Sequence, residues 1–138
     1  MILILIDPIL TGKTINMATV IHFDISADNI ERAKKFYEQL FDWNIEKFPN
    51  SSQDYYLIET RTENGEKGIT GGIARREKDY QKITNFIQVD SIDESITKVK
   101  ELGGQIIEPK TAIPTVGYIA GCKDTEDNIF GLIEVEKR

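Results

Sequence analysis

The sequence contains an internal repeat, and this repeat limits the possible folds more than any other feature of the chain. A shift of 62 positions places residues 25–46 on residues 87–108 without a gap, and six of the 22 aligned pairs are identical. The identical pairs are Ile25 with Ile87, Asp28 with Asp90, Ile30 with Ile92, Leu40 with Leu102, Ile45 with Ile107 and Glu46 with Glu108. Self-similarity at a fixed spacing indicates a supersecondary module that occurs more than once. The sequence therefore predicts a duplicated module.

The first copy begins with a strand that is followed by a helix. Residues 20–25 alternate in hydrophobicity, which places His22 and Asp24 on one face of the predicted strand. Asp28 or Asn29 is then positioned to cap a helix at its amino end. The apolar residues that follow recur at helical spacing and predict one apolar stripe. They are Ile30, Ala33, Phe36, Tyr37, Leu40 and Phe41.

The second copy repeats this order. Residues 83–89 are predicted as a strand, and Asp90 or Ser91 is positioned as the helix cap. Gly103-Gly104 ends the helix, because glycine adopts the left-handed cap conformation without a steric penalty. The apolar stripe of this helix consists of Ile92, Ile96, Val99 and Leu102.

Three shorter strands are predicted after each helix. In the first copy they span residues 43–48, 54–60 and 67–74, and in the second copy residues 105–107, 116–122 and 129–136. Asn64-Gly65 favours a hairpin turn between the last two strands of the first copy. Asp127-Asn128 is expected at the last turn of the second copy. Pro109 and Pro114 bracket a predicted loop, since proline is excluded from central strands.

Together the two copies predict an α+β fold. Each copy has the order βαβββ, with repeats at residues 18–77 and 82–136 inside a single domain over residues 17–138. One helix cannot cover both faces of a four-stranded sheet. Two modules joined edge to edge therefore predict a curved, eight-stranded mixed sheet with the helices outside and a central groove inside. Such a groove is typical of a small-molecule site.

Residues 1–16 are interpreted as a leader outside this domain. They contain a short apolar run that Asp7 and Pro8 interrupt, well below the roughly 20 apolar residues of a membrane span. They also lack the basic start of a signal peptide. We therefore expect no membrane partner and a cytoplasmic location. The leader is read as an upstream start, an expression remnant or an arm that adds a strand to a partner.

Composition excludes several other classes of protein. The formal net charge of −6 argues against a nucleic-acid partner, which requires a concentrated basic surface. Cys122 is the single cysteine of the sequence, so no internal disulfide framework and no cysteine-rich zinc site can form. As a nucleophile Cys122 would need an adjacent base, and the sequence has no second histidine to supply one. We expect it to be a small packed residue.

Several segments resemble the vicinal oxygen chelate superfamily, which comprises glyoxalases, bleomycin-resistance proteins and extradiol dioxygenases. In the first copy they are residues 22–28 (HFDISAD), 31–37 (ERAKKFY) and 40–43 (LFDW); in the second copy they are residues 89–93 (VDSID), 102–104 (LGG) and 124–128 (DTEDN), with Pro114 and Gly117. The closing turn departs from the family pattern at Thr125, where proline is common, and at Asp127, where glycine is common. The resemblance covers about residues 18–136 and is nearest to a poorly characterised glyoxalase-like branch.

The resemblance also raises the question of a metal centre. It implies that metal-dependent members take two ligands from each half, one on the first strand and one on the last. Here the first-strand positions fall on His22 and Thr84, and the last-strand positions fall on Gly131 and near Gly71-Gly72. Only the imidazole is a suitable ligand for Zn, Ni, Mn or Fe. Glu134 lies an odd number of residues from Gly131, so strand alternation turns it to the opposite face. We therefore predict no metal and no cofactor.

The alternative is a divalent metal at a non-standard site. Such a site would recruit Asp24, Glu59 or a residue of a partner chain beside His22.

The candidate site residues lie on the predicted groove face. They are His22, Asp24, Thr84, Phe86, Tyr118 and Gly131. Phe86 shares a strand face with Thr84 and offers an apolar wall to a flat or aliphatic ligand. His22 is the candidate catalytic residue, because imidazole is the side chain that ordinarily titrates near neutral pH. It can equally be a hydrogen-bonded groove residue, or a ligand contact without chemistry.

These observations predict a glyoxalase-like small-molecule-binding protein that lacks the usual metal and acts as a binder or as a metal-free enzyme. One alternative is a metal-dependent lyase or isomerase of the lactoylglutathione lyase type, or a related oxidoreductase. Another is a partner-binding or regulatory module. A homodimer is expected, because a second chain commonly covers the open sheet edges of this architecture.

Overall fold

The computed structural model describes residues 18–49 and 54–136, and the predicted leader at residues 1–16 lies outside these ranges. Within them the chain forms eight strands and two helices. In chain order they are β1 (Thr19–Ala27), α1 (Ile30–Phe41), β2 (Asn44–Lys47), β3 (Tyr55–Glu59), β4 (Thr70–Arg75), β5 (Ile83–Gln88), α2 (Ile92–Glu101), β6 (Gln105–Ile113), β7 (Gly117–Lys123) and β8 (Ile129–Val135). Each half therefore has the predicted order βαβββ.

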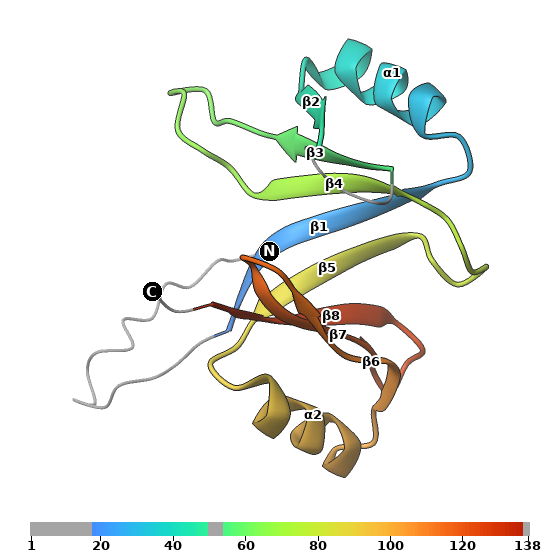
Figure 1. The fold of residues 1–138 in the computed structure, drawn as a ribbon, viewed down its shortest axis with the longest axis vertical. Helices are drawn as coiled ribbons and strands as arrows, with labels where there is room; N and C mark the ends of the chain where they lie inside the picture. Colours follow the sequence, from blue (N-terminus) through green and yellow to red (C-terminus); the bar gives the residue numbers. More distant parts are fainter. Residues whose placement is uncertain (1–17, 50–53, 137–138) are drawn as a thin grey trace, which may run out of the picture.

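The described strands form one mixed sheet in the order β2-β3-β4-β1-β5-β8-β7-β6. The sheet does not close into a barrel, because β2 and β6 remain at its two edges. β1 pairs with β4 in parallel and with β5 in antiparallel orientation, and β5 pairs with β8 in parallel orientation. Figure 1 shows β1 and β5 in the middle of the molecule, with α1 and α2 at opposite ends. The predicted α+β fold class is confirmed.

The strand register relates the two modules by a twofold rotation. His22 pairs with Phe86 across β1 and β5, and Asp24 pairs with Thr84. The 62-residue shift equates His22 with Thr84 and Asp24 with Phe86, so exchanging the modules maps each of these pairs onto the other. The outer neighbours follow the same rule, because Gly72 pairs with Asp24 while Gly131 pairs with Phe86.

Each module has its own apolar core between its helix and its half of the sheet. In the first module the core contains Ile25, Ala27, Ile30, Ile45, Ile58 and Ile73; in the second it contains Ile92, Ala120, Cys122 and Leu132. Asn29 caps α1 by accepting a hydrogen bond from the Arg32 amide. Ser91 caps α2 in the same way. The sequence left two candidate caps for each helix, and the structure selects the second of each pair.

The predicted apolar stripe of α1 is wrong for three of its residues. Phe36, Leu40 and Phe41 are 58%, 56% and 51% exposed, whereas Ile30 is buried. The stripe is wider than the strip of helix surface that the sheet covers. Phe36 therefore packs edge-on against the neighbouring Tyr37 ring, with 5.2 Å between ring centroids, and not against the core.

The predicted loop between the two prolines of the second module is also wrong. β6 runs through Pro109 and ends at Ile113. β6 is an edge strand, where proline is tolerated because the missing amide hydrogen is not needed by a neighbouring strand. The pairing with β7 shifts register on both sides of Glu108, so the strand bulges around the proline.

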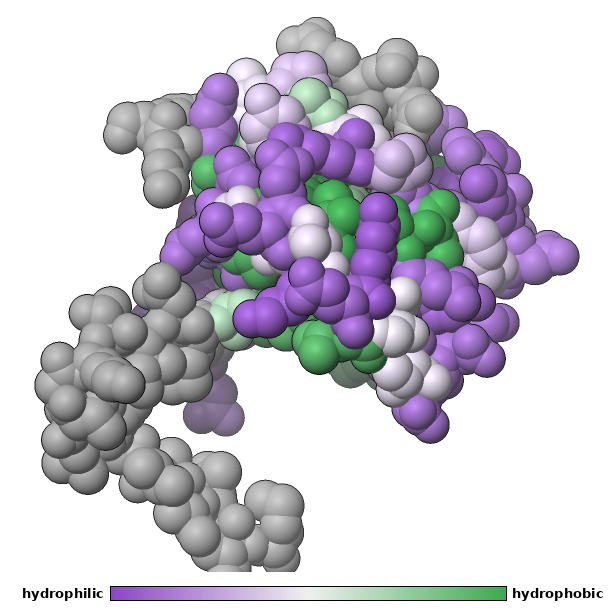
Figure 2. Space-filling view, turned by 90° about the horizontal axis from the view of Figure 1, so that it is seen from below, coloured by the Kyte–Doolittle hydropathy of each residue, from purple (hydrophilic) through white to green (hydrophobic). Residues whose placement is uncertain are grey.

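The surface at the α2 end of the molecule is mainly hydrophilic. Figure 2 shows this end with polar and charged residues over most of the described surface and hydrophobic residues in the gaps between them. Neither helix in the described ranges is long and apolar enough to cross a lipid bilayer.

The core assignment of the first module leads to a stability prediction. Ile73 is fully buried within the core cluster of the first module, so Ile73→Ala removes packed methyl groups and leaves a cavity. We expect the free energy of unfolding, measured by urea denaturation, to fall by about 2–5 kcal/mol. Ile69→Ala is the matched control, since Ile69 is 47% exposed, and it should cost less than about 1 kcal/mol. Equal losses for the two variants would contradict this core assignment.

Candidate functional site

The face of the sheet opposite the helices carries the candidate site. Ile25 of β1 packs in the core of the first module. Because side chains alternate along a strand, His22 and Asp24 lie on the other face. Their partners on β5 are Phe86 and Thr84, and the His22 and Phe86 rings are 6.0 Å apart between centroids. The central strands therefore bring four of the predicted site residues together on one surface, called here the concave face.

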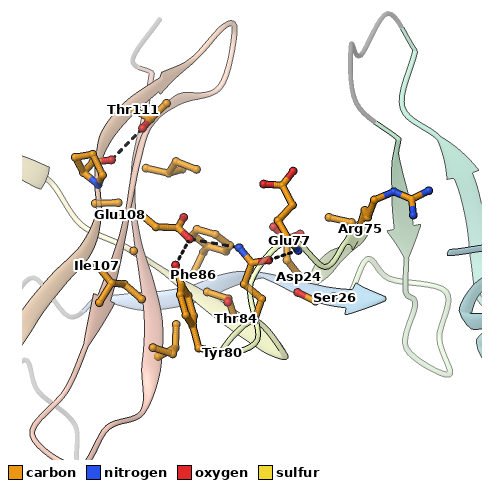
Figure 3. Close-up of a pocket in the computed structure, with 17 residues that line it drawn as sticks. Asp24, Ser26, Arg75, Glu77, Tyr80, Thr84, Phe86, Ile107, Glu108 and Thr111 are labelled. Carbon is orange, nitrogen blue, oxygen red and sulfur yellow. Dashed lines mark hydrogen bonds between the residues drawn. The ribbon is translucent and has the colours of Figure 1, made fainter. Parts of the chain in front are cut away.

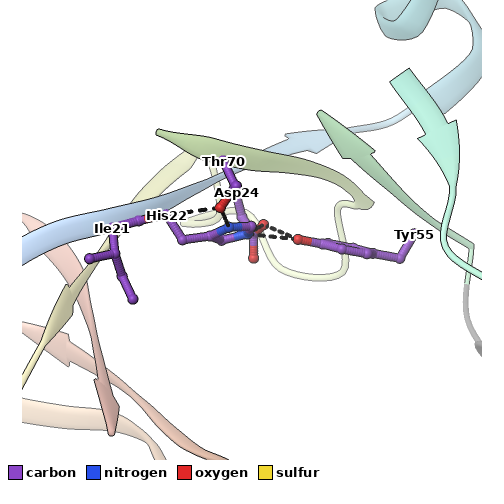
Figure 4. Close-up of polar contacts among 5 residues, drawn as sticks. All are labelled: Ile21, His22, Asp24, Tyr55 and Thr70. Atoms are coloured by element: carbon purple, nitrogen blue, oxygen red, sulfur yellow. Dashed lines mark hydrogen bonds and ion pairs between the residues drawn. The ribbon is translucent and has the colours of Figure 1, made fainter. Parts of the chain in front are cut away.

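A hydrogen-bonded network surrounds His22 on the concave face (Figure 4). The hydroxyl of Tyr55 donates to Asp24 Oδ1 over 2.6 Å. His22 Nε2 lies 2.9 Å from the same carboxylate oxygen and 2.8 Å from the Tyr55 oxygen. His22 Nδ1 lies 2.9 Å from Thr70 Oγ1. Both ring nitrogens are therefore engaged by the protein itself.

The network also fixes which groups donate. Tyr55 has one proton and gives it to Asp24, so the hydrogen on His22 Nε2 must point to the two oxygens. The single hydroxyl hydrogen of Thr70 faces two acceptors, His22 Nδ1 at 2.9 Å and the Ile21 carbonyl oxygen at 3.3 Å, so the donor is assigned at Nε2 alone. This assignment follows from the requirement that each contact has one donor and one acceptor.

Tyr55 remains protonated over a wide pH range. Burial raises the pKa of the Tyr55 hydroxyl well above its ordinary value, and the charge of Asp24 and the hydrogen bond to Asp24 raise it further. A tyrosine held in this way is a neutral donor. Its function in the network is to hold the Asp24 carboxylate in place.

A cavity of about 210 Å³ lies beside the network (Figure 3). Asp24, Thr84 and Phe86 line it from β1 and β5. Ile119 lines it from β7, and Glu108 from the bulged part of β6. The cavity is thus formed between the two central strands and the outer strands of the second module.

The connection between β4 and β5 borders the same cavity. Tyr80, in this connection, donates its hydroxyl to Glu108 Oε2 over 3.0 Å. Gln81 reaches the same oxygen over 3.5 Å. These contacts join the connection between the two modules to the edge strand of the second module.

Five of the six predicted site residues fall into three groups. Asp24, Thr84 and Phe86 line the cavity. His22 lies on the same face and contacts Asp24. Gly131 pairs with Phe86 on the neighbouring strand.

Tyr118 lies outside the cavity. It pairs with Glu134, whose carboxylate accepts the Ile92 amide at the start of α2, so Tyr118 belongs to the helix-covered face of β7. The Lys110 ammonium lies 4.4 Å from the centre of the Tyr118 ring. The next residue, Ile119, is the one that lines the cavity.

The four positions implied for a family metal centre do not fit such a centre. A Cβ at Gly72 would collide with the Tyr55 hydroxyl, and a Cβ at Gly131 would collide with the Phe86 ring. The space that a ligand side chain needs at those two positions is therefore filled. Among the residues that the structure describes, no three His, Cys, Asp or Glu side chains are grouped as a metal site. Glu59, a predicted substitute ligand, pairs with Arg61 over 3.3 Å.

Cys122 is fully buried in the core of the second module. Burial raises the pKa of its thiol to about 11, so the thiolate needed for nucleophilic attack does not form near neutral pH. This placement agrees with a packing residue.

Tyr55 was the main residue that sequence reasoning did not assign to the site, although a signal was present. Counting outward from the Asn64-Gly65 turn places Tyr55 opposite Ala74. The structure has this same pair, and Ala74 also lines the cavity. Closer to the turn, however, Arg61 pairs with Lys67, which is one residue out of that register, so counting from the turn gives the Tyr55 pair only because the register shifts between the turn and β3.

Known proteins provide three kinds of comparison. The model of the Glyoxalase/Bleomycin resistance protein/Dioxygenase superfamily matches residues 19–132 of this chain. A search of functionally curated proteins gave no significant match.

Several solved structures share the fold at low sequence identity. A hypothetical protein from Bacillus halodurans C-125 is 18% identical, with a TM-score of 0.61 over 89% of this chain and 98% of its own. A methylmalonyl-CoA epimerase variant from Streptomyces coelicolor, in complex with 2-nitronate-propionyl-CoA, is 10% identical, with a TM-score of 0.62 over 88% and 100%. The methylmalonyl-CoA epimerase from Mycobacterium tuberculosis is 11% identical, with a TM-score of 0.56 over 84% and 87%. The repeat, the fold and the family match agree, and this chain belongs to the Glyoxalase/Bleomycin resistance protein/Dioxygenase superfamily.

Proposed function

We propose that this protein binds a small organic molecule in the cavity on the concave face, and that it does so without the divalent metal of related enzymes. The observation that carries this proposal is that Tyr55 and Phe86 fill the side-chain space at Gly72 and Gly131. A cavity that borders Asp24, Thr84 and Phe86 lies next to the filled positions. Ligand sites combine apolar walls with a few well-placed polar groups, which is the composition found here.

The state of His22 also supports a site without metal. A divalent ion needs a free lone pair on the imidazole. Nε2 points its hydrogen at Asp24 and Tyr55, and Nδ1 is held by Thr70. An ion at His22 would have to displace one of these partners, and glycine at the other positions would supply no compensating ligand.

In this proposal Asp24 is the ligand-binding group and His22 is a positioning residue. Asp24 lines the cavity, whereas His22 contacts the Asp24 carboxylate and is not one of the lining residues. A carboxylate that is held by a neutral tyrosine and an imidazole is fixed before the ligand arrives. Such preorganisation reduces the entropy that binding would otherwise lose.

The alternative is a metal-dependent lyase or isomerase. Structural relatives with this fold include methylmalonyl-CoA epimerases, but their identity of 10–11% supports the fold alone. The metal measurement below separates this alternative from the proposal.

We also propose that the protein forms a homodimer. The strands β2 and β6 leave two sheet edges unpaired within the described chain, and unpaired edges are commonly covered in native proteins. Phe36, Leu40 and Phe41 add exposed apolar surface on α1. We expect sedimentation equilibrium to give twice the chain mass. A chain that stays monomeric at micromolar concentration would contradict this.

Metal titration tests the central proposal. We expect protein purified without chelator to hold no stoichiometric ion. Added Ni, Zn or Mn should change the melting temperature of the wild type by the same amount as that of His22→Ala. An ion that binds only the native state, at a free concentration of 100 times its Kd, would raise the free energy of unfolding by about 2.7 kcal/mol. One ion per chain, with a stabilisation that His22→Ala abolishes, would establish the metal-dependent alternative instead.

The Tyr55 network predicts a specific pH dependence. The pKa of Tyr55 is raised in the native state above its ordinary value of 10.0, so the native protein keeps a proton that the unfolded chain releases. This contribution to stability is complete below about pH 10 and decreases as the pH rises further. We therefore expect Tyr55→Phe to reduce the slope of unfolding free energy against pH above pH 10, by up to about 1.4 kcal/mol per pH unit. Urea denaturation at several alkaline pH values measures both slopes, and equal slopes would contradict the network.

A further inference from the structure

The cavity on the concave face has an excess of negative charge. Asp24, Glu77 and Glu108 line it together with one cationic side chain, Arg75. Figure 3 shows Arg75 at the end of the cavity far from Phe86, with its guanidinium directed away from that ring and from Glu108. A cleft lined mainly by one sign of charge concentrates ligands of the opposite sign. The inner part of the cavity therefore favours a cation.

Two of these carboxylates each keep an oxygen that no described residue uses. Asp24 Oδ1 accepts hydrogen bonds from both Tyr55 and His22, and no hydrogen bond from the described residues reaches Asp24 Oδ2. Glu108 receives Tyr80 and Gln81 on Oε2, and within the same ranges its Oε1 has no donor. Carboxylate oxygens accept hydrogen bonds and cannot donate them when ionised. A ligand at this place must therefore supply the donor hydrogens.

The remaining walls are apolar. Phe86, which pairs with His22, lines the cavity from β5, and Ile119 and Ile129 line it from β7 and β8. The volume of about 210 Å³ is below the roughly 300–1,000 Å³ of pockets for drug-sized ligands. The ligand is thus small, with a hydrocarbon part beside its polar group.

Resting on the small-molecule site proposed above, we infer that the ligand is a small organic cation, a protonated amine on an aromatic or aliphatic body. Its ammonium group donates to Asp24 Oδ2, and Glu108 adds to the negative potential around it. Its hydrocarbon part lies against Phe86 and Ile119. An anionic ligand of the same size would place its charge beside Asp24, Glu77 and Glu108, and such like-charge contacts are costly.

Three probes of matched size test the charge of the ligand: phenethylamine, 2-phenylethanol and phenylacetate. Isothermal titration calorimetry gives their affinities, and methyl-labelled isoleucine spectra report whether Ile119 and Ile129 respond. We expect phenethylamine to bind at least about tenfold more tightly than 2-phenylethanol, with phenylacetate the weakest. Added salt should weaken the binding of phenethylamine and leave the binding of 2-phenylethanol unchanged.

Variants show whether the carboxylates of the cavity are responsible. Asp24→Asn should weaken the binding of phenethylamine at least about tenfold and leave the affinity for 2-phenylethanol unchanged. Glu77→Gln, which alters an exposed side chain, should weaken the amine about two- to threefold. Glu101→Gln is the matched control, because it removes the same charge from the exposed end of α2 outside the cavity. It should change neither affinity.

The outcomes separate this inference from the function on which it rests. If 2-phenylethanol or phenylacetate binds as tightly as phenethylamine and shifts the Ile119 and Ile129 signals, the site stands and the cationic ligand is wrong. If Glu101→Gln weakens the amine as much as Glu77→Gln does, the effect is one of overall charge and the inference fails. If no probe shifts these signals at about 10 mM, near the weak end of measurable affinity, both the site and its ligand class are wrong.

Discussion

The antiparallel pairing of β1 with β5 is the contact on which the rest of the structure depends. The apolar cores of the two modules are separate, so this pair of central strands holds the halves in register. The register sets Asp24 opposite Thr84 and His22 opposite Phe86. A slip by one residue would turn these side chains to the helix-covered face and remove the cavity. The repeat therefore determines the site as well as the fold.

On this scaffold one half of the site has been built differently from the other. Gly72 and Gly131 are equivalent under the twofold rotation, and both are glycines. In the first module the space above the glycine holds the Tyr55 hydroxyl, and in the second it holds the Phe86 ring. The space beside the glycine thus holds a polar contact to Asp24 in the first module and an apolar wall in the second. A ligand with one polar and one apolar end matches this asymmetry.

Much of the architecture could be predicted from the sequence because the repeat carries long-range information. The 62-residue shift, with the alternation in the first strand, was enough to place Asp24, Thr84 and Phe86 on one face. Tyr118 could not be placed, since the phase of β7 depends on its pairing with β8. β6 was cut short because proline was taken as a break, whereas an edge strand accepts it. The exposed part of the α1 stripe depends on how much of the helix the sheet covers, which composition does not show.

Centrally, Tyr55 and Phe86 fill the side-chain space at Gly72 and Gly131, the two positions at which the family resemblance implies metal ligands. Anomalous diffraction at the cobalt absorption edge, from crystals grown with cobalt chloride, tests it most directly. The account predicts no anomalous peak within coordination distance, about 2.0–2.2 Å, of either His22 nitrogen, with the Tyr55 hydroxyl still on Asp24. A peak on His22 with Tyr55 turned away from Asp24 would contradict it.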